Sequence, residues 1–355
     1  MQLFETYKLG SLELKNRIVM APMTRSRAID NIPNDLMKTY YTQRAGAGLI
    51  VTEGTSPSVN GLGYPRIPGA YSPAQIEGWG KIAESVHNEG GLIFVQLMHC
   101  GRITASENIP QGGETVAPSA VQADGKMYTD TKGEMPHETP RAMELADIEQ
   151  AQNEYVQSAQ KLIRAGVDGV ELHAANGYLM DQFLNPASNL RTDGYGGNLE
   201  NRARFVLETA QKVASVIGPD KVGIRFSPYG AMNDLNPYFD DLTELYVYLA
   251  AELKKIGIAY IHLVDHRGAM GAPDFKTEIR KTIKGTFAGT VITGGDVDSK
   301  QKAQKLLDDG FDLVYIGRPF ISNPDLVEKL KNEKDLKAPD PNTFYTPGAE
   351  GYTDY

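Results

Sequence analysis

Short apolar runs rich in β-branched residues recur along the chain, and segments with helical spacing of their apolar positions separate these runs. The eight runs are RIVMAP from Arg17, LIVTEG from Leu49, LIFVQL from Leu92, GVELH from Gly169, VGIRFS from Val222, IAYIHLV from Ile258, TVITGG from Thr290 and DLVYIG from Asp312. Helices are expected over residues 34–46, 73–89, 147–165, 198–216, 242–256, 275–284, 299–309 and 323–333. Strands that alternate with helices are typical of βαβ units, and eight such units close a barrel. The pattern therefore predicts an α/β protein built as a (β/α)8 TIM barrel.

Two of the expected helices carry start signals. Ser72 precedes Pro73, which fits an N-cap followed by proline at the first helical position. Asp147 stands three residues before Gln150, a spacing typical of a capping box. An open doubly wound sheet would also alternate strands and helices, but it would place a G-x-G-x-x-G motif after the first strand. The GLGYP segment from Gly61 lacks the third glycine and lies between the second and third runs, so the barrel is favoured.

Three segments fall outside the repeating pattern. Residues 3–14 resemble a β-hairpin around Leu9 and Gly10 that would cover the N-terminal end of the barrel. Residues 101–146 form a long excursion rich in glycine and proline after the third run, and long loops without a helix of their own are commonly binding loops or lids. Residues 339–355 are aromatic and polar, and we expect them to pack against the barrel. A barrel with such insertions is expected to form one domain over residues 1–355.

The composition is that of a globular protein, with 41% hydrophobic and 23% charged residues. The formal net charge is −9 and no cluster of Lys and Arg interleaved with aromatic residues stands out, so a nucleic-acid partner is not expected. Cys100 is the only cysteine, which excludes a disulfide framework and Cys-ligated iron–sulfur or zinc sites. No apolar stretch reaches the roughly 20 residues that span a bilayer, and no secretory signal is evident, so a cytoplasmic location is expected.

The residues at the C-terminal ends of the eight runs are unusually polar for barrel packing, and in this architecture the active site lies where the strands end. In chain order these residues are Thr24, Glu53 with Gly54, Gln96, His173, Arg225, His262, Gly294 with Gly295, and Gly317 with Arg318. Arg225 lies among apolar neighbours in VGIRFS, so its guanidinium needs a buried anionic or carbonyl partner. Thr24 and Gln96 could hydrogen-bond the carbonyl edges of the same ligand.

His173, Asn176 and Tyr178 lie in ELHAANGYLMDQF just beyond the fourth run, at a spacing that allows one shared target. Two groups that bind a carbonyl oxygen, together with a phenol that can release a proton, suit addition across an activated C=C bond. The same spacing also fits a strand-end His and Asn that cap a loop, with a Tyr packed against it. The spacing alone leaves both interpretations open.

Phosphate binding is expected at the ends of the seventh and eighth runs. Gly294 and Gly295 precede one helix, and Gly317 and Arg318 precede the next, which is where barrels bind phosphate. Glycines allow backbone N–H groups to approach the anion, and an arginine adds a charge-assisted hydrogen bond. Gly-rich junctions also occur in barrels without phosphate, so a structural role is the alternative.

The histidines do not predict a metal site. His87 and His137 are expected at the surface, and His99 either belongs to the barrel mouth or orients the loop after the third run. His262 and His266 follow the sixth run without the H-x-H or H-E-x-x-H spacing that would favour a metal.

Several longer segments resemble the old yellow enzyme family, and together they run the whole length of the chain. They are NRIVMAPMTRSRA, YYTQRAGAGLIVTEGT, VQLMHCGR, VDGVELHAANGYLMDQFLNPASNLRTDGYGGNLENRARF, GIRFSP, IGRPFISNPDL and FYTPGAEGYTDY. The likeness is greatest to the bacterial N-ethylmaleimide and pentaerythritol tetranitrate reductases. The resemblance implies a flavin mononucleotide (FMN) enzyme that takes hydride from NADPH or NADH and passes it to an electron-poor alkene.

The resemblance also implies roles for individual residues. FMN would be held by Pro22, Met23, Thr24, Gly54, Gln96 and Arg225 around its ring and by Gly294, Gly295, Gly317 and Arg318 at its phosphate. The substrate would meet His173 and Asn176 at its activating group, Tyr178 as proton donor, and Tyr345 in the pocket wall. Relatives carry Trp where Met98 stands, which implies a wider or softer pocket here. Thr24 stands where another branch of the family has Cys, so a hydroxyl would tune the flavin.

Two other functions are compatible with a barrel. A lyase or isomerase acting on a phosphorylated substrate would use the same phosphate site, but a Schiff-base aldolase needs a strand-end lysine, and none of the eight runs ends in lysine. A flavin-binding module without turnover is the second alternative. The sequence pattern fits NADPH or NADH as donor, an alkene, nitro compound or nitrate ester as acceptor, and a monomer or a homodimer.

Overall fold

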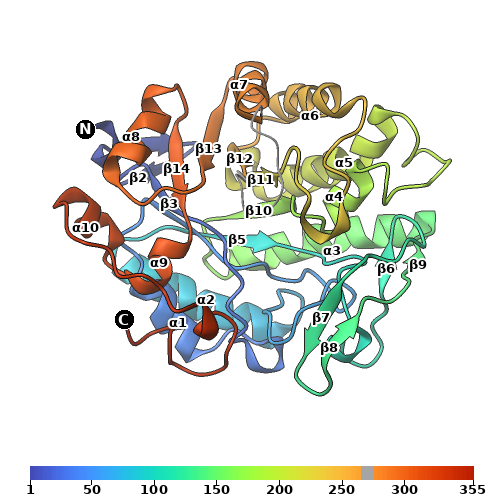
Figure 1. The fold of residues 1–355 in the computed structure, drawn as a ribbon, viewed down its shortest axis with the longest axis horizontal. Helices are drawn as coiled ribbons and strands as arrows, with labels where there is room; N and C mark the ends of the chain where they lie inside the picture. The colour runs from blue at the N-terminus through green and yellow to red at the C-terminus, as the bar shows by residue number, and fades with distance from the viewer. Residues whose placement is uncertain (265–275) are drawn as a thin grey trace.

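The computed structural model describes residues 1–264 and 276–355, and its centre is a closed barrel of eight parallel strands (Figure 1). Around the barrel the strands are β3 (Ile18–Met20), β4 (Leu49–Val51), β5 (Ile93–Leu97), β10 (Gly169–Ala174), β11 (Val222–Phe226), β12 (Tyr260–Leu263), β13 (Thr290–Gly294) and β14 (Leu313–Ile316). Nearly all of their residues are buried, as expected for a parallel sheet covered on both faces. Each apolar run contains one strand, so the predicted barrel is confirmed.

Helices surround the barrel and alternate with its strands (Figure 1). Those at the expected places are α1 (Asp35–Thr42), α2 (Pro73–Asn88), α3 (Leu145–Arg164), α5 (Leu199–Ile217), α6 (Leu242–Ile256), α7 (Lys276–Phe287), α8 (Lys300–Asp308) and α10 (Leu326–Lys331). Two short helices lie where the sequence predicted none, and these are α4 (Leu179–Leu184) and α9 (Arg318–Ser322). Both follow directly on barrel strands or their loops, so they lie at the end of the barrel where a ligand is expected.

The helix start signals are partly confirmed. Ser72 caps α2, because its hydroxyl accepts from the backbone N–H of Gln75 and the Gln75 side chain accepts from the backbone N–H of Ser72. The expected start at Asp147 is wrong. Helix α3 begins one turn earlier with Glu144 as N-cap, and the Asp147 carboxylate accepts from the Glu144 backbone N–H over 2.7 Å. A capping box has a polar residue at the N-cap and another at the third helical position. Asp147 occupies the third position and was predicted to be the N-cap.

The N-terminal hairpin consists of β1 (Tyr7–Leu9) and β2 (Leu12–Leu14), as expected. Its turn contains Gly10 at φ +57°, where a Cβ would lie 2.9 Å from the Cβ of Asp220, so only glycine fits without strain. Leu9 and Leu14 are completely buried against residues at the start of barrel strands, such as Leu49. The hairpin therefore covers the N-terminal end of the barrel, and ligands must approach from the opposite end.

The excursion over residues 101–146 contains two small sheets in place of an irregular loop. The antiparallel pair is β7 (Lys126–Thr129) with β8 (Gly133–Pro136), and the parallel pair is β6 (Val116–Ala117) with β9 (Arg141–Ala142). Such short strands leave too few alternating positions to be recognised in a sequence. The surface position expected for His137 is also wrong. The residue is buried, and its Nδ1 hydrogen-bonds the carbonyl of Thr104 over 3.1 Å.

The C-terminal segment packs against the barrel, as expected. Tyr352 is completely buried and its ring stacks on that of Tyr40 in α1, with centroids 4.1 Å apart. Arg27, which is 1% exposed, holds the same segment through its guanidinium. It donates to the backbone carbonyls of Thr343, Phe344, Gly348 and Glu350.

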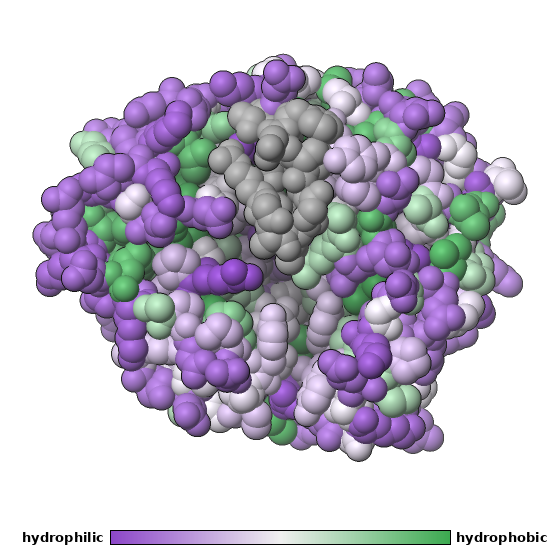
Figure 2. Space-filling model, in the orientation of Figure 1, coloured by the Kyte–Doolittle hydropathy of each residue, from purple (hydrophilic) through white to green (hydrophobic). Residues whose placement is uncertain are grey.

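The face drawn in Figure 2 is mainly hydrophilic, and its apolar residues form small separate groups. Large apolar side chains that are exposed, such as Leu145, Leu190 and Tyr238, come from different segments of the chain. Within residues 1–264 and 276–355, no helix is long and apolar enough to span a bilayer.

Candidate active site

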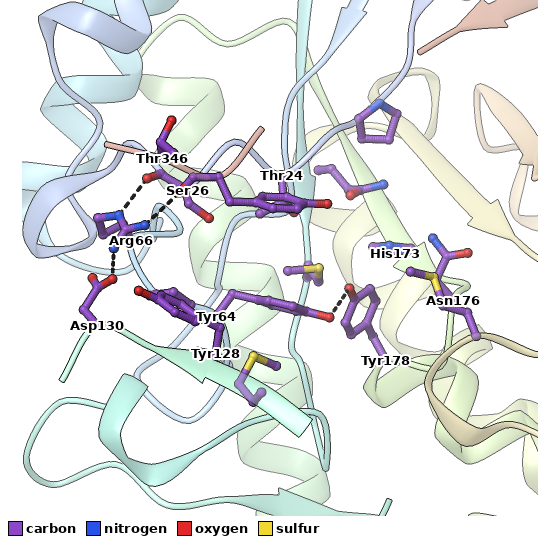
Figure 3. Close-up of a pocket in the computed structure, with 18 of the residues that line it drawn as sticks. Thr24, Ser26, Tyr64, Arg66, Tyr128, Asp130, His173, Asn176, Tyr178 and Thr346 are labelled. Carbon is purple, nitrogen blue, oxygen red and sulfur yellow. Dashed lines mark hydrogen bonds and ion pairs between the residues drawn. The ribbon is translucent and has the colours of Figure 1, made fainter. Parts of the chain in front are cut away.

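A cavity of about 820 Å³ opens at the C-terminal ends of the barrel strands (Figure 3). Ten of the predicted site residues line it, and they are Pro22, Thr24, Gly54, Gln96, Met98, His173, Asn176, Tyr178, Arg225 and Tyr345. They follow or belong to β3, β4, β5, β10 and β11, except for the last, which comes from the C-terminal segment. A cavity of this volume suits a cofactor or a substrate of moderate size.

Five predicted residues lie outside the lining of this cavity. Gly294 ends β13 and is followed by Gly295, while Gly317 follows β14 and Arg318 begins α9. Met23 lies between the cavity residues of the first strand and these glycines, because a Cβ on Gly317 would be 3.6 Å from the Met23 sulfur. The candidate phosphate residues are therefore neighbours of the cavity, on the side of β3. Arg318 itself is exposed.

Gly54 and Met98 pack against each other in the cavity wall. A Cβ on Gly54 would lie 2.4 Å from the Met98 sulfur, a distance that no real contact shows. Met98 is 1% exposed, and its thioether fills the space that glycine leaves. The absence of a side chain at position 54 therefore sets the position of Met98.

The loop after β10 carries the predicted substrate-binding residues, and buried polar groups fix its turn. Asn176 has φ +60° and Gly177 φ +79°, in the left-handed region that favours asparagine and glycine. The backbone N–H of Gly177 donates to Asp181 Oδ2 over 3.0 Å. The backbone N–H of Asn176 donates to Ser227 Oγ over 2.8 Å, and this hydroxyl in turn donates to the same Asp181 oxygen over 3.2 Å. Asp181 therefore anchors the turn from α4.

We expect Asp181→Asn to change the pH dependence of stability. Burial raises the pKa of Asp181 from 3.8 to about 7. As the pH rises from about 4 to 7, the unfolded chain releases this proton before the folded chain does, so the wild type loses stability over that range. Relative to wild type, D181N should gain up to about 1.4 kcal/mol of unfolding free energy per pH unit between pH 5 and 7.

Urea unfolding of both proteins at several pH values measures this difference. Asp35→Asn is the control, because Asp35 is exposed and its pKa is lowered by Lys38. The free energy of unfolding of this control should differ from that of the wild type by a constant amount between pH 5 and 7. A constant difference for D181N as well would show that burial does not raise the pKa of Asp181 in the folded protein.

His173 and Tyr178 are both held in their neutral forms. Burial lowers the pKa of His173 well below its usual value, and the positive charge of Arg225 lowers it further. Burial raises the pKa of Tyr178 well above 10, and the neighbouring hydroxyl of Tyr64 adds to this effect. The rings of His173 and Tyr178 meet edge to face, with centroids 5.0 Å apart. A neutral imidazole and a protonated phenol thus share one wall of the cavity (Figure 3).

Two buried nitrogen atoms at the mouth of the barrel test whether the site fits a flavin. Arg225 Nε and His173 Nδ1 are buried, and neither has a hydrogen-bond partner within the described part of the chain. Unsatisfied buried groups of this kind are costly unless a ligand pairs with them. Arg225 and Gln96 both line the cavity, so a carbonyl-bearing ring with an anionic edge would satisfy the guanidinium. The residues present therefore fit FMN.

Tyr64 also belongs to the site, although it was not predicted from the sequence. Tyr178 Oη donates a hydrogen bond to Tyr64 Oη over 3.0 Å, and Figure 3 shows the two hydroxyls facing each other. Tyr64 lies in the GLGYP segment, which was considered only as a failed dinucleotide motif. Nothing in the local sequence links this segment to the loop after β10, because the contact spans 114 residues.

The outer part of the cavity was also not predicted. Arg66 pairs with Asp130, which follows β7, and its guanidinium donates to the backbone carbonyl of Tyr345 over 2.8 Å (Figure 3). Lys126 and Tyr128 of β7 complete this side. The excursion and the C-terminal segment therefore form the outer walls of the cavity, as a binding loop would.

Two histidines outside this wall, His99 and His87, make structural contacts. His99 Nδ1 accepts from the backbone N–H of Gly101 over 3.0 Å, so it orients the loop after β5, and burial lowers its pKa to about 3. His87 is exposed and pairs with Asp168, as expected for a surface position. His266 lies outside the described residues. Among those that the structure does describe, no three His, Cys, Asp or Glu side chains are grouped to hold a metal ion.

Comparison with known proteins assigns the family. The model of the NADH:flavin oxidoreductase / NADH oxidase family matches residues 2–337. The solved old yellow enzyme homologue from Zymomonas mobilis is 39% identical, with a TM-score of 0.93 over 100% of this chain and 99% of that one. The chain belongs to the old yellow enzyme family. It is therefore a flavin oxidoreductase with FMN as cofactor and a reduced nicotinamide as electron donor.

Further relatives of this old yellow enzyme are reductases. Morphinone reductase is 44% identical, with a TM-score of 0.94 over 99% of this chain and 95% of that one, and its structure is also known in complex with tetrahydroNAD. The probable flavin mononucleotide-dependent alkene reductase of Leishmania infantum is 38% identical, over 98% of this chain and 95% of its own length. The family gives no support to the alternative of a lyase or isomerase.

Proposed function

We propose that this old yellow enzyme is an ene reductase that reduces electron-poor C=C bonds in the cavity at the barrel mouth. The substrates are α,β-unsaturated carbonyl and nitro compounds, and nitrate esters are included as further acceptors. The observation that carries the proposal is the wall of His173, Asn176 and Tyr178, which faces the cavity. When bound there, FMN reduced by NADH or NADPH supplies the hydride that one alkene carbon receives.

The residues assigned to FMN are those that the structure gathers at or beside the mouth. The ring would be held by Pro22, Met23, Thr24, Gly54, Gln96 and Arg225, and the phosphate by Gly294, Gly295, Gly317 and Arg318. The buried Nε of Arg225 supports the first group, because it is a charged donor that needs an acceptor. The short distance between Gly317 and Met23 supports the second, because Gly317 is a neighbour of one of the residues assigned to the ring.

On the substrate side, His173 and Asn176 donate hydrogen bonds to the activating oxygen. Both are neutral donors, so they polarise the C=C bond without adding a full charge. Tyr178 donates its proton to the carbon next to the activating group. The raised pKa of Tyr178 keeps its phenol protonated at neutral pH before that step. The side chains of Tyr64 and Asn233 lie next to the Tyr178 hydroxyl and would hydrogen-bond the phenolate that remains. Met98 and Tyr345 then determine how wide a substrate the cavity accepts.

The proposed function is tested by following the flavin through both half-reactions. We expect purified protein to be yellow, and NADH or NADPH to bleach the flavin absorbance without oxygen. Adding 2-cyclohexen-1-one to the reduced protein should restore the absorbance. Cyclohexanone is the matched control, because it has the same carbonyl without the C=C bond, and it should leave the protein reduced.

Two results would contradict the proposal. Protein that takes up no FMN would exclude the assigned site. Reduced protein that cyclohexenone and nitroalkenes fail to reoxidise would leave a flavin-binding protein without ene reductase activity.

A further inference from the structure

We propose that Glu171, in the barrel interior beneath the cavity, is a positioning residue that orients Gln96 and balances Arg225, and so sets the reduction potential of the bound flavin. The inference rests on the proposed function, in which Gln96 and Arg225 contact the flavin ring. Glu171 lies on β10, two residues before His173, and it does not line the cavity itself.

Glu171 is a completely buried carboxylate with three hydrogen-bond donors around it. Gln96 Nε2 donates to Oε1 over 2.7 Å, Tyr260 Oη donates to Oε2 over 3.0 Å, and His262 Nδ1 donates to Oε2 over 2.9 Å. Burial alone raises the pKa of Glu171, but the hydrogen bonds from His262 and Gln96 and the positive charge of Arg225 outweigh that effect and hold the pKa below its usual value. Glu171 therefore carries a negative charge in the barrel interior at neutral pH.

The barrel register explains how these groups meet. Gln96 on β5 lies directly opposite Glu171 on β10, and Gly223 on β11 lies opposite Glu171 on the other side. Gly223 has no side chain, and a Cβ there would lie 2.1 Å from Cζ of Tyr260. The Tyr260 ring occupies this space and so reaches Glu171 from β12, across one intervening strand. The carboxylate site is thus built by the sheet itself and depends on no loop.

The first consequence concerns the amide of Gln96. An ionised carboxylate only accepts hydrogen bonds, so the Gln96 end that faces Glu171 must be the NH₂ group. The carbonyl Oε1 is then the end left for the cavity, which Gln96 lines. Gln96 Oε1 is therefore a fixed acceptor for an N–H group of the ligand. Without Glu171, the Gln96 amide could rotate and turn its NH₂ group toward the ligand.

The second consequence concerns charge. Arg225 is a buried cation on β11, two residues beyond the Gly223 that lies opposite Glu171, and its positive charge lowers the pKa of Glu171. Burial lowers the pKa of His262, so His262 serves as a neutral donor and adds no charge. Glu171 therefore offsets Arg225. Without this offset the mouth would be more positive, and a reduced flavin, which carries more negative charge than an oxidised one, would be stabilised.

The test compares Glu171→Gln and Glu171→Asp in the FMN-loaded protein. Anaerobic reductive titration against a reference dye measures the reduction potential, and ultrafiltration measures the dissociation constant of FMN. E171Q removes the charge, so its potential should shift to more positive values. E171D keeps the charge but shortens the side chain, so its potential should stay near that of the wild type. Both variants should bind FMN more weakly, on the order of tenfold, because Gln96 loses a fixed partner.

The control is Glu208→Gln on α5, which removes a carboxylate bonded to Tyr195 and Gln152 outside the barrel. It should match the wild type in both measurements. The inference is overturned if E171Q titrates at the wild-type potential, or if E171D shifts it equally. Should E171Q fail to fold, wild-type affinity of E171D for FMN would overturn the orienting role. Failure of the wild type to bind FMN would instead refute the proposed function.

Discussion

Replacing Tyr178 by phenylalanine is expected to slow reoxidation of the reduced protein by 2-cyclohexen-1-one by about 10²- to 10⁴-fold, the usual range for a positioned general acid. The phenol is the protonated group in the cavity wall beside His173, and Phe keeps the ring that packs there. Flavin reduction by NADH or NADPH transfers no proton from Tyr178, so its rate should stay close to that of the wild type. Stopped-flow measurement of the two half-reactions separates these effects.

Tyr64→Phe is the matched control for this prediction. It removes the hydroxyl that accepts from Tyr178 but leaves the proton donor itself in place. We expect a smaller loss in the reoxidation rate than for Tyr178→Phe. If Tyr178→Phe reoxidises as fast as the wild type while Tyr64→Phe is slow, the acid has been assigned to the wrong tyrosine.

Replacing Arg27 by leucine is expected to lower the free energy of unfolding by about 3–5 kcal/mol, because a buried charged donor and its hydrogen bonds to the C-terminal segment are lost. The guanidinium holds the C-terminal segment through four of its backbone carbonyls. Burial lowers the pKa of Arg27 to about 10, so the side chain remains a cation at neutral pH. The same segment carries Tyr345 in the cavity wall, so KM for large substrates should rise more than kcat falls.

Urea unfolding and steady-state kinetics measure the two effects of this change. Gln43→Ala is the control, because Gln43 also holds the segment, but through one exposed hydrogen bond to the carbonyl of Thr353. That variant should lose less than about 1 kcal/mol, as surface substitutions usually do. Equal stability losses in the two variants would show that Arg27 does not hold the segment in place.

The barrel was predictable from the sequence because each of its strands is a continuous apolar run, such as that from Leu49, and each run meets a helix of ordinary length. The small sheets of the excursion were not predictable, because β7 and β8 depend on pairing with each other across a short turn. Only alternate residues of β7 are buried. Helix α4 was missed for a similar reason. All of its six residues are buried, so it shows no apolar stripe that would identify a helix.

The candidate site was predictable only in part. Strand-end residues such as Gln96 and Arg225 were found because barrel geometry brings them to one rim. Tyr64 and Arg66 were missed, because they reach the cavity through contacts with Tyr178 and Asp130 that are distant in sequence. The roles of individual residues, the single domain over 1–355, a cytoplasmic location and a monomeric or dimeric state stay predictions.

A crystal structure of the oxidised, FMN-loaded protein with 2-cyclohexen-1-one tests the central claim most directly. The ketone oxygen should lie within about 2.6–3.2 Å of a nitrogen of both His173 and Asn176, with the Tyr178 hydroxyl above the carbon next to the carbonyl. A flavin bound away from Gln96 and Arg225, or a ketone held by other residues, would contradict the account.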